Sequence, residues 1–340
     1  MPVEIVKLHE IYGPVVRTGP DDLSFNSPEA IADIYKKGWQ KGDFYKGFAQ
    51  PEPGLFSIRD EKLHAERKRM FALGFSMISI RSMEGIIDSR YAILRQQLDR
   101  FAKSGETFDL RRYITYCIVD ILGELAFGEA FDNQVTEDPG KIPPVSEALW
   151  GSCLAGQAPW SASLFAWMRD NMPSPQVREV LAALNLMIPI AVKTIKQREA
   201  KQLQRPDILG KLMAAREEKT GKPLTTEQIV AESVTLIVGG THTTGNTLHI
   251  LLANLSRNSE HLQRVINEID SKLPVLDTNQ AAYSISGLEE KLDFVNAAIT
   301  ESHRKDPVGT FNMPRTVPVG GANIAGYSVP AGVCVPLTGL

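Results

Sequence analysis

Residues 226–257 read TEQIVAESVTLIVGGTHTTGNTLHILLANLSR, and this stretch decides the fold class. Both halves carry apolar side chains on most faces, which predicts a buried helix of roughly 48 Å at 1.5 Å per residue. Thr225 and Gln228 form a capping box that marks its start. We therefore expect a mainly α protein, a helical bundle around this long central helix.

The centre of the predicted helix has an unusual composition. Gly239, Gly240 and Gly245 each cost roughly 1 kcal/mol relative to alanine in a helix interior. Polar His242 and β-branched Thr243 stand among them. Two explanations remain open from these residues alone. Either the chain breaks here into two helices, with the threonines bonded back to the backbone, or a ligand lies against the glycine backbone and the hydroxyls act on it.

Helical patterns separated by Pro and Gly fill most of the remaining chain. They cover residues 28–37, 60–72, 80–102, 112–127, 145–153, 176–201, 207–219, 260–271 and 289–304. Short strands are predicted at 15–18 and 23–25, and residues 305–340 read as strands and turns. These patterns indicate a mainly α chain with a small β region.

Composition narrows the function classes. The chain has 340 residues, 43% of them hydrophobic, and a net charge of −3, which argues against a nucleic-acid partner. Cys117, Cys153 and Cys334 lie far apart, so the spacing predicts neither a disulfide framework nor a zinc site. Because no window approaches 18 consecutive apolar residues, we expect a soluble chain without a transmembrane segment.

A second group of motifs follows the central helix. Glu301 and Arg304 lie three apart on one helix face and can pair, although such pairs are commonly solvated. Next come Met313-Pro314-Arg315 and a Gly-rich segment, GGANIAGYSVPAG, at residues 320–332. Each of these motifs alone is too common to indicate a protein family, whereas their order along the chain is specific.

In this order the motifs resemble the cytochrome P450 family of haem-thiolate monooxygenases, most closely its fungal microsomal members. In the N-terminal half, residues 12–17 and 23–25 are similar to the family's first strand pair. His64-x-x-x-Lys68-Arg69 is similar to the helix beside a haem propionate. The resemblance covers essentially the whole chain and implies a single P450-like domain over residues 1–340, built as a helical bundle.

The resemblance implies roles for the residues of the central helix. Gly240 matches the position where the helix packs against the haem face, and Thr243 matches the hydroxyl that helps to deliver protons to dioxygen. His242 replaces the family's usual acid, and imidazole can also shuttle protons near neutral pH. Thr243 and His242 are therefore the candidate catalytic residues.

The resemblance also assigns cofactor contacts. Arg315 matches a cation at one haem propionate, and His64 with Lys68 or Arg69 matches the contacts to the other. Charge-assisted bonds to a carboxylate suit these side chains. Glu301 and Arg304 match a buried structural ion pair.

The family's haem ligand is a cysteine in a loop well after the Val-Pro-x-Gly turn that here ends at Gly332. We expect this chain to lack that loop and to be shortened at both ends, without the family's membrane anchor. Cys334 is expected to be a core thiol and not the haem ligand, so no residue of this chain is assigned to a metal.

By resemblance, the protein is a haem-dependent monooxygenase that oxidises an apolar small molecule, in fungal secondary metabolism. NADPH–cytochrome P450 reductase is the implied partner, and a full-length form is expected at the surface of the endoplasmic reticulum membrane. The alternative is a non-catalytic truncated remnant or splice form without stable haem ligation, which leaves open whether this chain is an active enzyme.

Overall fold

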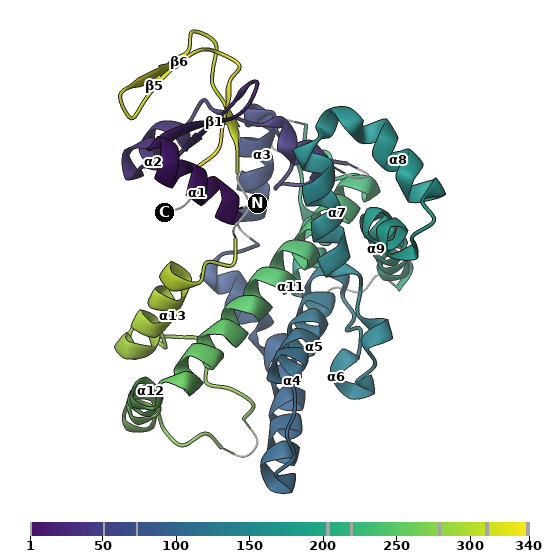
Figure 1. Cartoon of the computed structure of the whole chain (residues 1–340). Helices are drawn as coiled ribbons and strands as arrows, with labels where there is room; N and C mark the ends of the chain where they lie inside the picture. The colour runs from purple at the N-terminus through teal and green to yellow at the C-terminus, as the bar shows by residue number, and fades with distance from the viewer. Residues whose placement is uncertain are drawn as a thin grey trace. The chain divides into compact units, whose positions relative to one another are not determined.

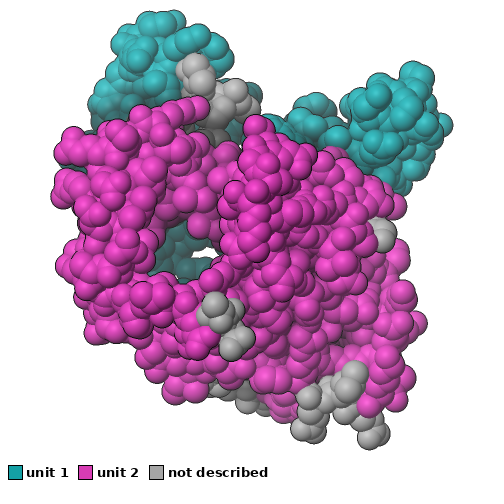
Figure 2. Space-filling view, turned by 90° about the horizontal axis from the view of Figure 1, so that it is seen from below, with its two compact units in different colours: residues 1–69, 150–182, 310–340 teal, residues 70–149, 183–309 magenta. Residues whose placement is uncertain are grey.

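The computed structural model describes residues 2–49, 52–72, 74–201, 205–217, 220–277, 280–309 and 313–337. The chain forms two compact units, each assembled from separated segments (Figure 2). Unit 1 comprises residues 1–69, 150–182 and 310–340, and unit 2 comprises residues 70–149 and 183–309. The expectation of a single domain stays a prediction.

Unit 2 is organised around helix α11, Thr226–Arg257 (Figure 1). Helix α5, Leu110–Leu122, makes the most extensive contact with it, and α4, Met77–Ser104, packs on α5. Helices α12, Ser259–Lys272, and α13, Asp293–Lys305, also contact α11. The predicted mainly α fold around the 226–257 helix is confirmed.

Helix α11 runs without interruption through its glycine-rich centre. Both bonds of the predicted capping box are present, from Gln228 N to the Thr225 hydroxyl and from Thr225 N to the Gln228 side chain. The explanation in which two helices meet at a turn near Gly240 is therefore wrong. Packing of the apolar halves against other helices of unit 2 outweighs the low helix propensity of the centre.

Helix α5 continues into a π-helical turn, η2, at Gly123–Phe127. The sequence predicts one regular helix over 112–127, and the structure changes its hydrogen-bonding pattern after Leu122. The turn contacts both α11 and the short helix α10, Ile208–Ala214.

Unit 1 contains a five-stranded sheet in the order β1-β2-β7-β4-β3. Its strands are β1 Val15–Gly19, β2 Asp22–Phe25, β3 Gln40–Lys41, β4 Arg315–Thr316 and β7 Cys334–Val335. Strands β2 and β7 are parallel, and the other pairs are antiparallel. A hairpin of β5, Ala322–Ile324, and β6, Tyr327–Val329, follows β4 in the chain. Strands from both ends of the chain thus share the five-stranded sheet, whereas β5 and β6 form a separate two-stranded sheet.

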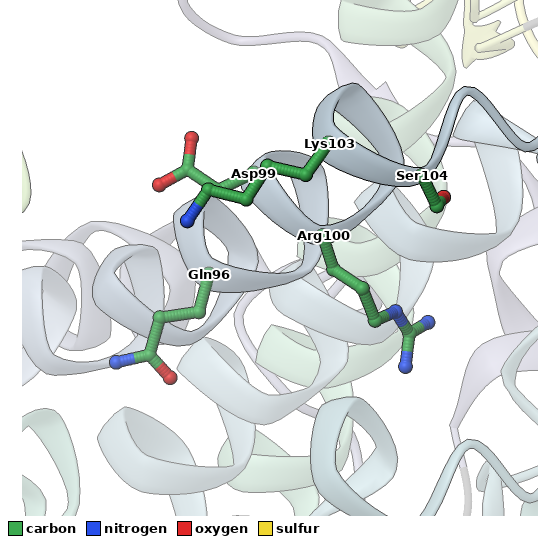
Figure 3. A pocket seen from close by; sticks show the side chains of 5 residues that line it. All are labelled: Gln96, Asp99, Arg100, Lys103 and Ser104. Carbon is green, nitrogen blue, oxygen red and sulfur yellow. The ribbon is translucent and has the colours of Figure 1, made fainter.

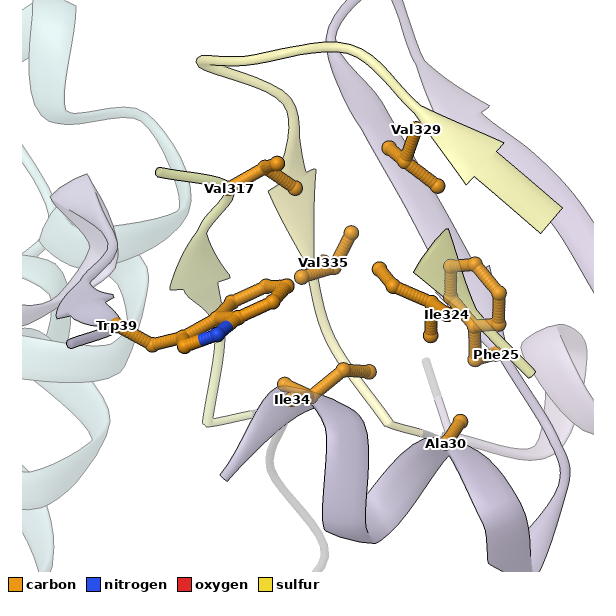
Figure 4. Packing of buried hydrophobic residues seen from close by; sticks show 8 residues of the cluster. All are labelled: Phe25, Ala30, Ile34, Trp39, Val317, Ile324, Val329 and Val335. Carbon is orange, nitrogen blue, oxygen red and sulfur yellow. The ribbon is translucent and has the colours of Figure 1, made fainter. Parts of the chain in front are cut away.

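A hydrophobic cluster joins this sheet to helix α2, Pro28–Ile34 (Figure 4). Ser27 caps α2 and Pro28 occupies its first turn, and both residue types are preferred at these positions. Cluster members come from both ends of the chain: Phe25, Ala30, Ile34, Trp39, Val317, Ile324, Val329 and Val335.

The other elements complete the description: α1 Pro2–Tyr12, η1 Asp43–Phe48, α3 Glu61–Ala72, α6 Asn133–Thr136, η3 Pro139–Lys141, α7 Val145–Gln157, η4 Pro159–Ser161, α8 Ala162–Asn171 and α9 Pro175–Lys201. Helices α1 and α8 are not anticipated from the sequence. Helix α13 starts at Asp293 instead of residue 289, and α10 ends at Ala214 instead of residue 219. Residues 218 and 219 of that last prediction lie outside the described part of the chain.

Candidate haem-binding residues

The two glycines at the centre of α11 have different surroundings. A Cβ on Gly240 would lie 2.9 Å from Leu122 Cδ1 of α5, so this glycine permits the close approach of two helices. A Cβ on Gly239 would meet no described atom within 4 Å, because this glycine borders open space. The assignment of Gly240 to the haem face stays a prediction, and Gly239 is the glycine whose backbone is accessible.

The threonines of α11 also differ. The Thr243 hydroxyl donates to the Gly239 carbonyl oxygen at 2.7 Å, and its side chain is exposed. This bond is the back-bonding that the first explanation of the sequence included. Thr241 is buried, and its hydroxyl has no hydrogen-bond partner among the described residues.

His242 is paired with a residue one turn further along the helix. The Asn246 side-chain amide donates to His242 Nδ1 at 2.5 Å. Neutral imidazole carries one proton, so this bond places the proton on Nε2. Both side chains are half-buried, and Nε2 is the ring nitrogen that remains to exchange a proton.

The candidate propionate contacts lie in unit 1. Arg315 is half-buried in β4, and its Nη1 donates to the Tyr45 hydroxyl at 3.0 Å and to the carbonyls of Met313 and Pro314. Among the described residues no acceptor pairs with its Nη2 or Nε, and no carboxylate forms an ion pair with it. A guanidinium with free donors and an uncompensated charge suits a carboxylate ligand.

His64 in α3 is close to the same charges. Burial is the main cause that lowers its pKa, and the cations Lys41, Lys68 and Arg315 lower it further. His64 is therefore a neutral side chain at neutral pH that can donate one hydrogen bond. The carboxylate of Glu61 opposes this effect and raises the pKa of His64 in part. We call the three positive charges that act on His64, those of Lys41, Lys68 and Arg315, the cation cluster.

Helix α3 presents its three consecutive cations differently. Lys68 and Arg69 are exposed, whereas Arg67 is only 4% exposed. Arg67 Nη1 has no hydrogen-bond partner in the described ranges. Lys68 or Arg69 as a propionate contact stays a prediction, and the buried Arg67 was not singled out from the sequence.

Glu301 and Arg304 form the predicted pair, but not in the predicted environment. Arg304 Nε and Nη2 donate to the two carboxylate oxygens of Glu301 at 2.7 and 2.5 Å. The side chains are 59% and 71% exposed. The predicted burial of this pair is therefore wrong for this structure, because the face of α13 that carries it has no covering element among the described residues.

Cys334 lies in β7, between β2 and β4. Burial, together with the hydrogen bond to Asp22, raises the pKa of its thiol to about 12. The thiol is thus protonated at neutral pH in this structure. The expectation that Cys334 is a core thiol and not the haem ligand stays a prediction. In the described part of the chain, no three His, Cys, Asp or Glu side chains are grouped as metal ligands.

A surface hollow of about 560 Å³ lies along α4 (Figure 3). Its lining consists of polar and charged side chains from one helix: Gln96, Asp99, Arg100, Lys103 and Ser104. Arg100 is already paired with Glu137 at 3.0 Å. Small-molecule sites are mostly apolar, so this hollow does not resemble one.

Two members of the arrangement around Arg315 were missed from the sequence. Lys41 and Tyr45 lie outside the sequence motifs described above, and only the pairing of β3 with β4 brings them to Arg315. A partial signal exists in the aromatic run at residues 44–48, which indicates a packed segment beside Lys41.

The fold and these residues define a helical protein with a long central helix and a separate group of cations. The family model for cytochrome P450 matches residues 1–339. The chain belongs to the cytochrome P450 family.

Fungal relatives agree with this assignment. A cytochrome P450 monooxygenase, ORF11, of Penicillium roqueforti is 30% identical over 98% of this chain and 69% of the relative. Cytochrome P450 monooxygenase aclL of Aspergillus oryzae is also 30% identical, over 98% and 67%. Pisatin demethylase of Fusarium vanettenii is 27% identical, over 98% and 66%. The chain therefore spans about two thirds of the length of these relatives.

Among the described helices, none is by itself both long and apolar enough to cross a membrane. One bent pair, α3 with α4, reaches that length and apolar composition, and nothing else indicates that it crosses a membrane.

Proposed function

We propose that this chain supplies the haem-binding and oxygen-activating part of a monooxygenase that oxidises an apolar small molecule. Membership of the cytochrome P450 family supports the class of reaction. The cation cluster supports the cofactor, and it is the single structural observation on which the haem assignment rests.

The residues present fit haem in the chemistry of their donors. Haem carries two carboxylates, and Arg315 offers donors that no described acceptor uses. His64 adds a neutral donor within the field of Lys41, Lys68 and Arg315.

Bound haem would supply the activation of dioxygen, while the protein positions substrate and delivers protons. The Thr243 hydroxyl would hold a proton at Oγ1, supported by its bond to the Gly239 carbonyl. His242 would exchange a proton at Nε2, because Asn246 occupies Nδ1. We assign no haem contact to Cys334, which lies in β7 between β2 and β4 of the sheet.

The substrate and partner are proposed from the relatives. Their names describe monooxygenases and a demethylase from fungi, so we propose an apolar secondary metabolite as substrate. Electrons would come from NADPH through NADPH–cytochrome P450 reductase.

The test is to produce the protein that contains this chain together with the reductase and to measure haem content and oxygenated products. A panel of terpenoids, polyketides and indoles is the substrate set, and products are identified by mass spectrometry. The His64→Ala/Arg315→Ala double variant should fold but lose haem. Purified parent protein without haem, or a haem-loaded protein that oxygenates nothing in the presence of reductase, would contradict the proposal.

A further inference from the structure

Lys41 and Arg315 are direct cross-strand partners in the antiparallel pair β3–β4. Like charges in directly opposite positions destabilise a sheet. The fold therefore needs a feature that offsets the repulsion between these two side chains.

The ring of Tyr45 lies beside both cations. Lys41 Nζ is 5.3 Å from the ring centroid and Arg315 Cζ is 5.7 Å from it. Both distances fall within the range of about 6 Å in which an aromatic face attracts a cation. One ring thus offsets part of the repulsion between the two charges.

Neighbouring side chains hold Tyr45 in place. Its exposed fraction is 1%, and its ring packs against Phe44 and Phe56 at centroid distances of 5.7 and 5.2 Å. Lys41 Nζ also donates to the carbonyls of Leu55 and Phe56, which fixes the ammonium above the same aromatic group. The arrangement is preorganised by packing and does not depend on a flexible loop.

Tyr45 positions Arg315 without neutralising it. The phenol accepts the Arg315 Nη1 bond at 3.0 Å. Burial raises the pKa of Tyr45, so the phenol is uncharged and the full positive charge of the guanidinium remains. Tyr35 contributes a second ring face, 5.0 Å from Arg315 Cζ.

We propose that Tyr45 is a positioning residue, which holds Lys41 and Arg315 side by side so that they recognise the paired carboxylates of a porphyrin. This inference rests on the proposed haem-dependent function and adds Lys41 and Tyr45 to its cofactor site. In this proposal, the positive charges of Lys41 in β3 and Arg315 in β4 together bind one ligand that carries two negative charges.

The experiment uses two metal-free probes on residues 1–340: protoporphyrin IX and its dimethyl ester. The ring is the same in both, and the ester lacks the two negative charges. Quenching of tryptophan fluorescence gives a dissociation constant for each probe. The ratio of the two constants isolates carboxylate recognition, and it requires neither iron, reductase nor turnover.

The parent protein is expected to bind the free acid at least roughly tenfold more tightly than the ester, as charge-assisted hydrogen bonds require. Tyr45→Leu, Lys41→Gln and Arg315→Gln should each lower that preference. Tyr45→Phe keeps the aromatic ring and should lose only part of the preference for the free acid. Tyr113→Phe is the matched control, because its buried hydroxyl also bonds an arginine, Arg100, but in unit 2.

Circular dichroism identifies variants that fail to fold; if Tyr45→Leu is one of them, Tyr45→Phe and the two cation variants decide. Tyr45 variants that keep the parental preference would overturn the inference and leave the haem proposal standing. A parent that binds both probes equally, or neither, would overturn the haem assignment together with this inference.

Discussion

Arg198 donates to the Asp207 carboxylate at 2.7 Å, with 6% and 0% of the two side chains exposed. Asp207 also caps α10 by accepting from Gly210 N at 2.8 Å. Asp207→Ala would remove the carboxylate that pairs with the buried Arg198 guanidinium and is expected to cost roughly 3–5 kcal/mol of unfolding free energy. Urea denaturation measures this loss. Asp170→Ala, which removes the exposed partner of Arg169, is the control and should leave the midpoint unchanged; equal effects would contradict the prediction.

The two glycines of α11 should respond differently to the same substitution. Gly239→Ala adds a Cβ into open space and is expected to stabilise the haem-free chain by roughly 1 kcal/mol, the helix-propensity gain. Gly240→Ala should gain less or lose stability, because its Cβ would lie 2.9 Å from Leu122 Cδ1. Thermal unfolding measures both. In a Leu122→Ala background the two changes should become alike; a difference that persists there would show that Leu122 is not the cause.

Glu301→Ala should have little effect on the stability of this chain. The Glu301–Arg304 pair is exposed, and exposed ion pairs contribute little because water and salt screen them. We expect an unchanged unfolding midpoint at physiological salt, compared with Glu260→Ala as an exposed acidic control on α12. A large loss of stability would mean that the pair is covered in solution.

Thr243→Ala applies to the haem-loaded protein with reductase. If the Thr243 hydroxyl delivers protons, NADPH consumption should continue while product formation falls by roughly 10²–10⁴-fold. Oxygen should then leave as hydrogen peroxide, which a peroxidase assay quantifies. Thr243→Ser keeps the hydroxyl and should keep most of the product. If Thr243→Ala forms as much product per NADPH consumed as the parent protein, Thr243 does not deliver protons and has only a structural role, through its bond to the Gly239 carbonyl.

Cys334 should be chemically inert. Its pKa of about 12 leaves almost no thiolate at neutral pH. Iodoacetamide followed by mass spectrometry should leave Cys334 unmodified in the folded chain and modify it in urea. Cys334→Ala should leave the absorption spectrum of added haem unchanged. Rapid alkylation of the native protein, or a spectral change in the variant, would contradict this expectation.

The central helix was predictable because its signals are local. The capping box at Thr225 and the apolar periodicity give the bounds that α11 has in the structure. The start of α2 follows from Ser27 and Pro28 in the same way. The spacing of Glu301 and Arg304 likewise predicts their pairing, since residues three apart share a helix face.

The rest depends on contacts between distant segments. Burial of the Glu301–Arg304 pair is decided by what packs over α13, and the spacing carries no information about that. Lys41 and Arg315 are opposed only because β3 pairs with β4 in one register. Which glycine of α11 faces α5 likewise depends on Leu122, more than 100 positions earlier.

The order of strands in the sheet of unit 1 has a consequence for synthesis. Strand β2 pairs with β7, with Asp22 opposite Cys334. At about 5–20 residues per second, β2 leaves the ribosome roughly 15–60 s before its partner. During that interval one edge of β2 has no strand from its own chain beside it, and unpaired edges are templates for aggregation. Unit 2 lies between these strands in the chain, so the nascent protein needs its edge protected until the last strands are made.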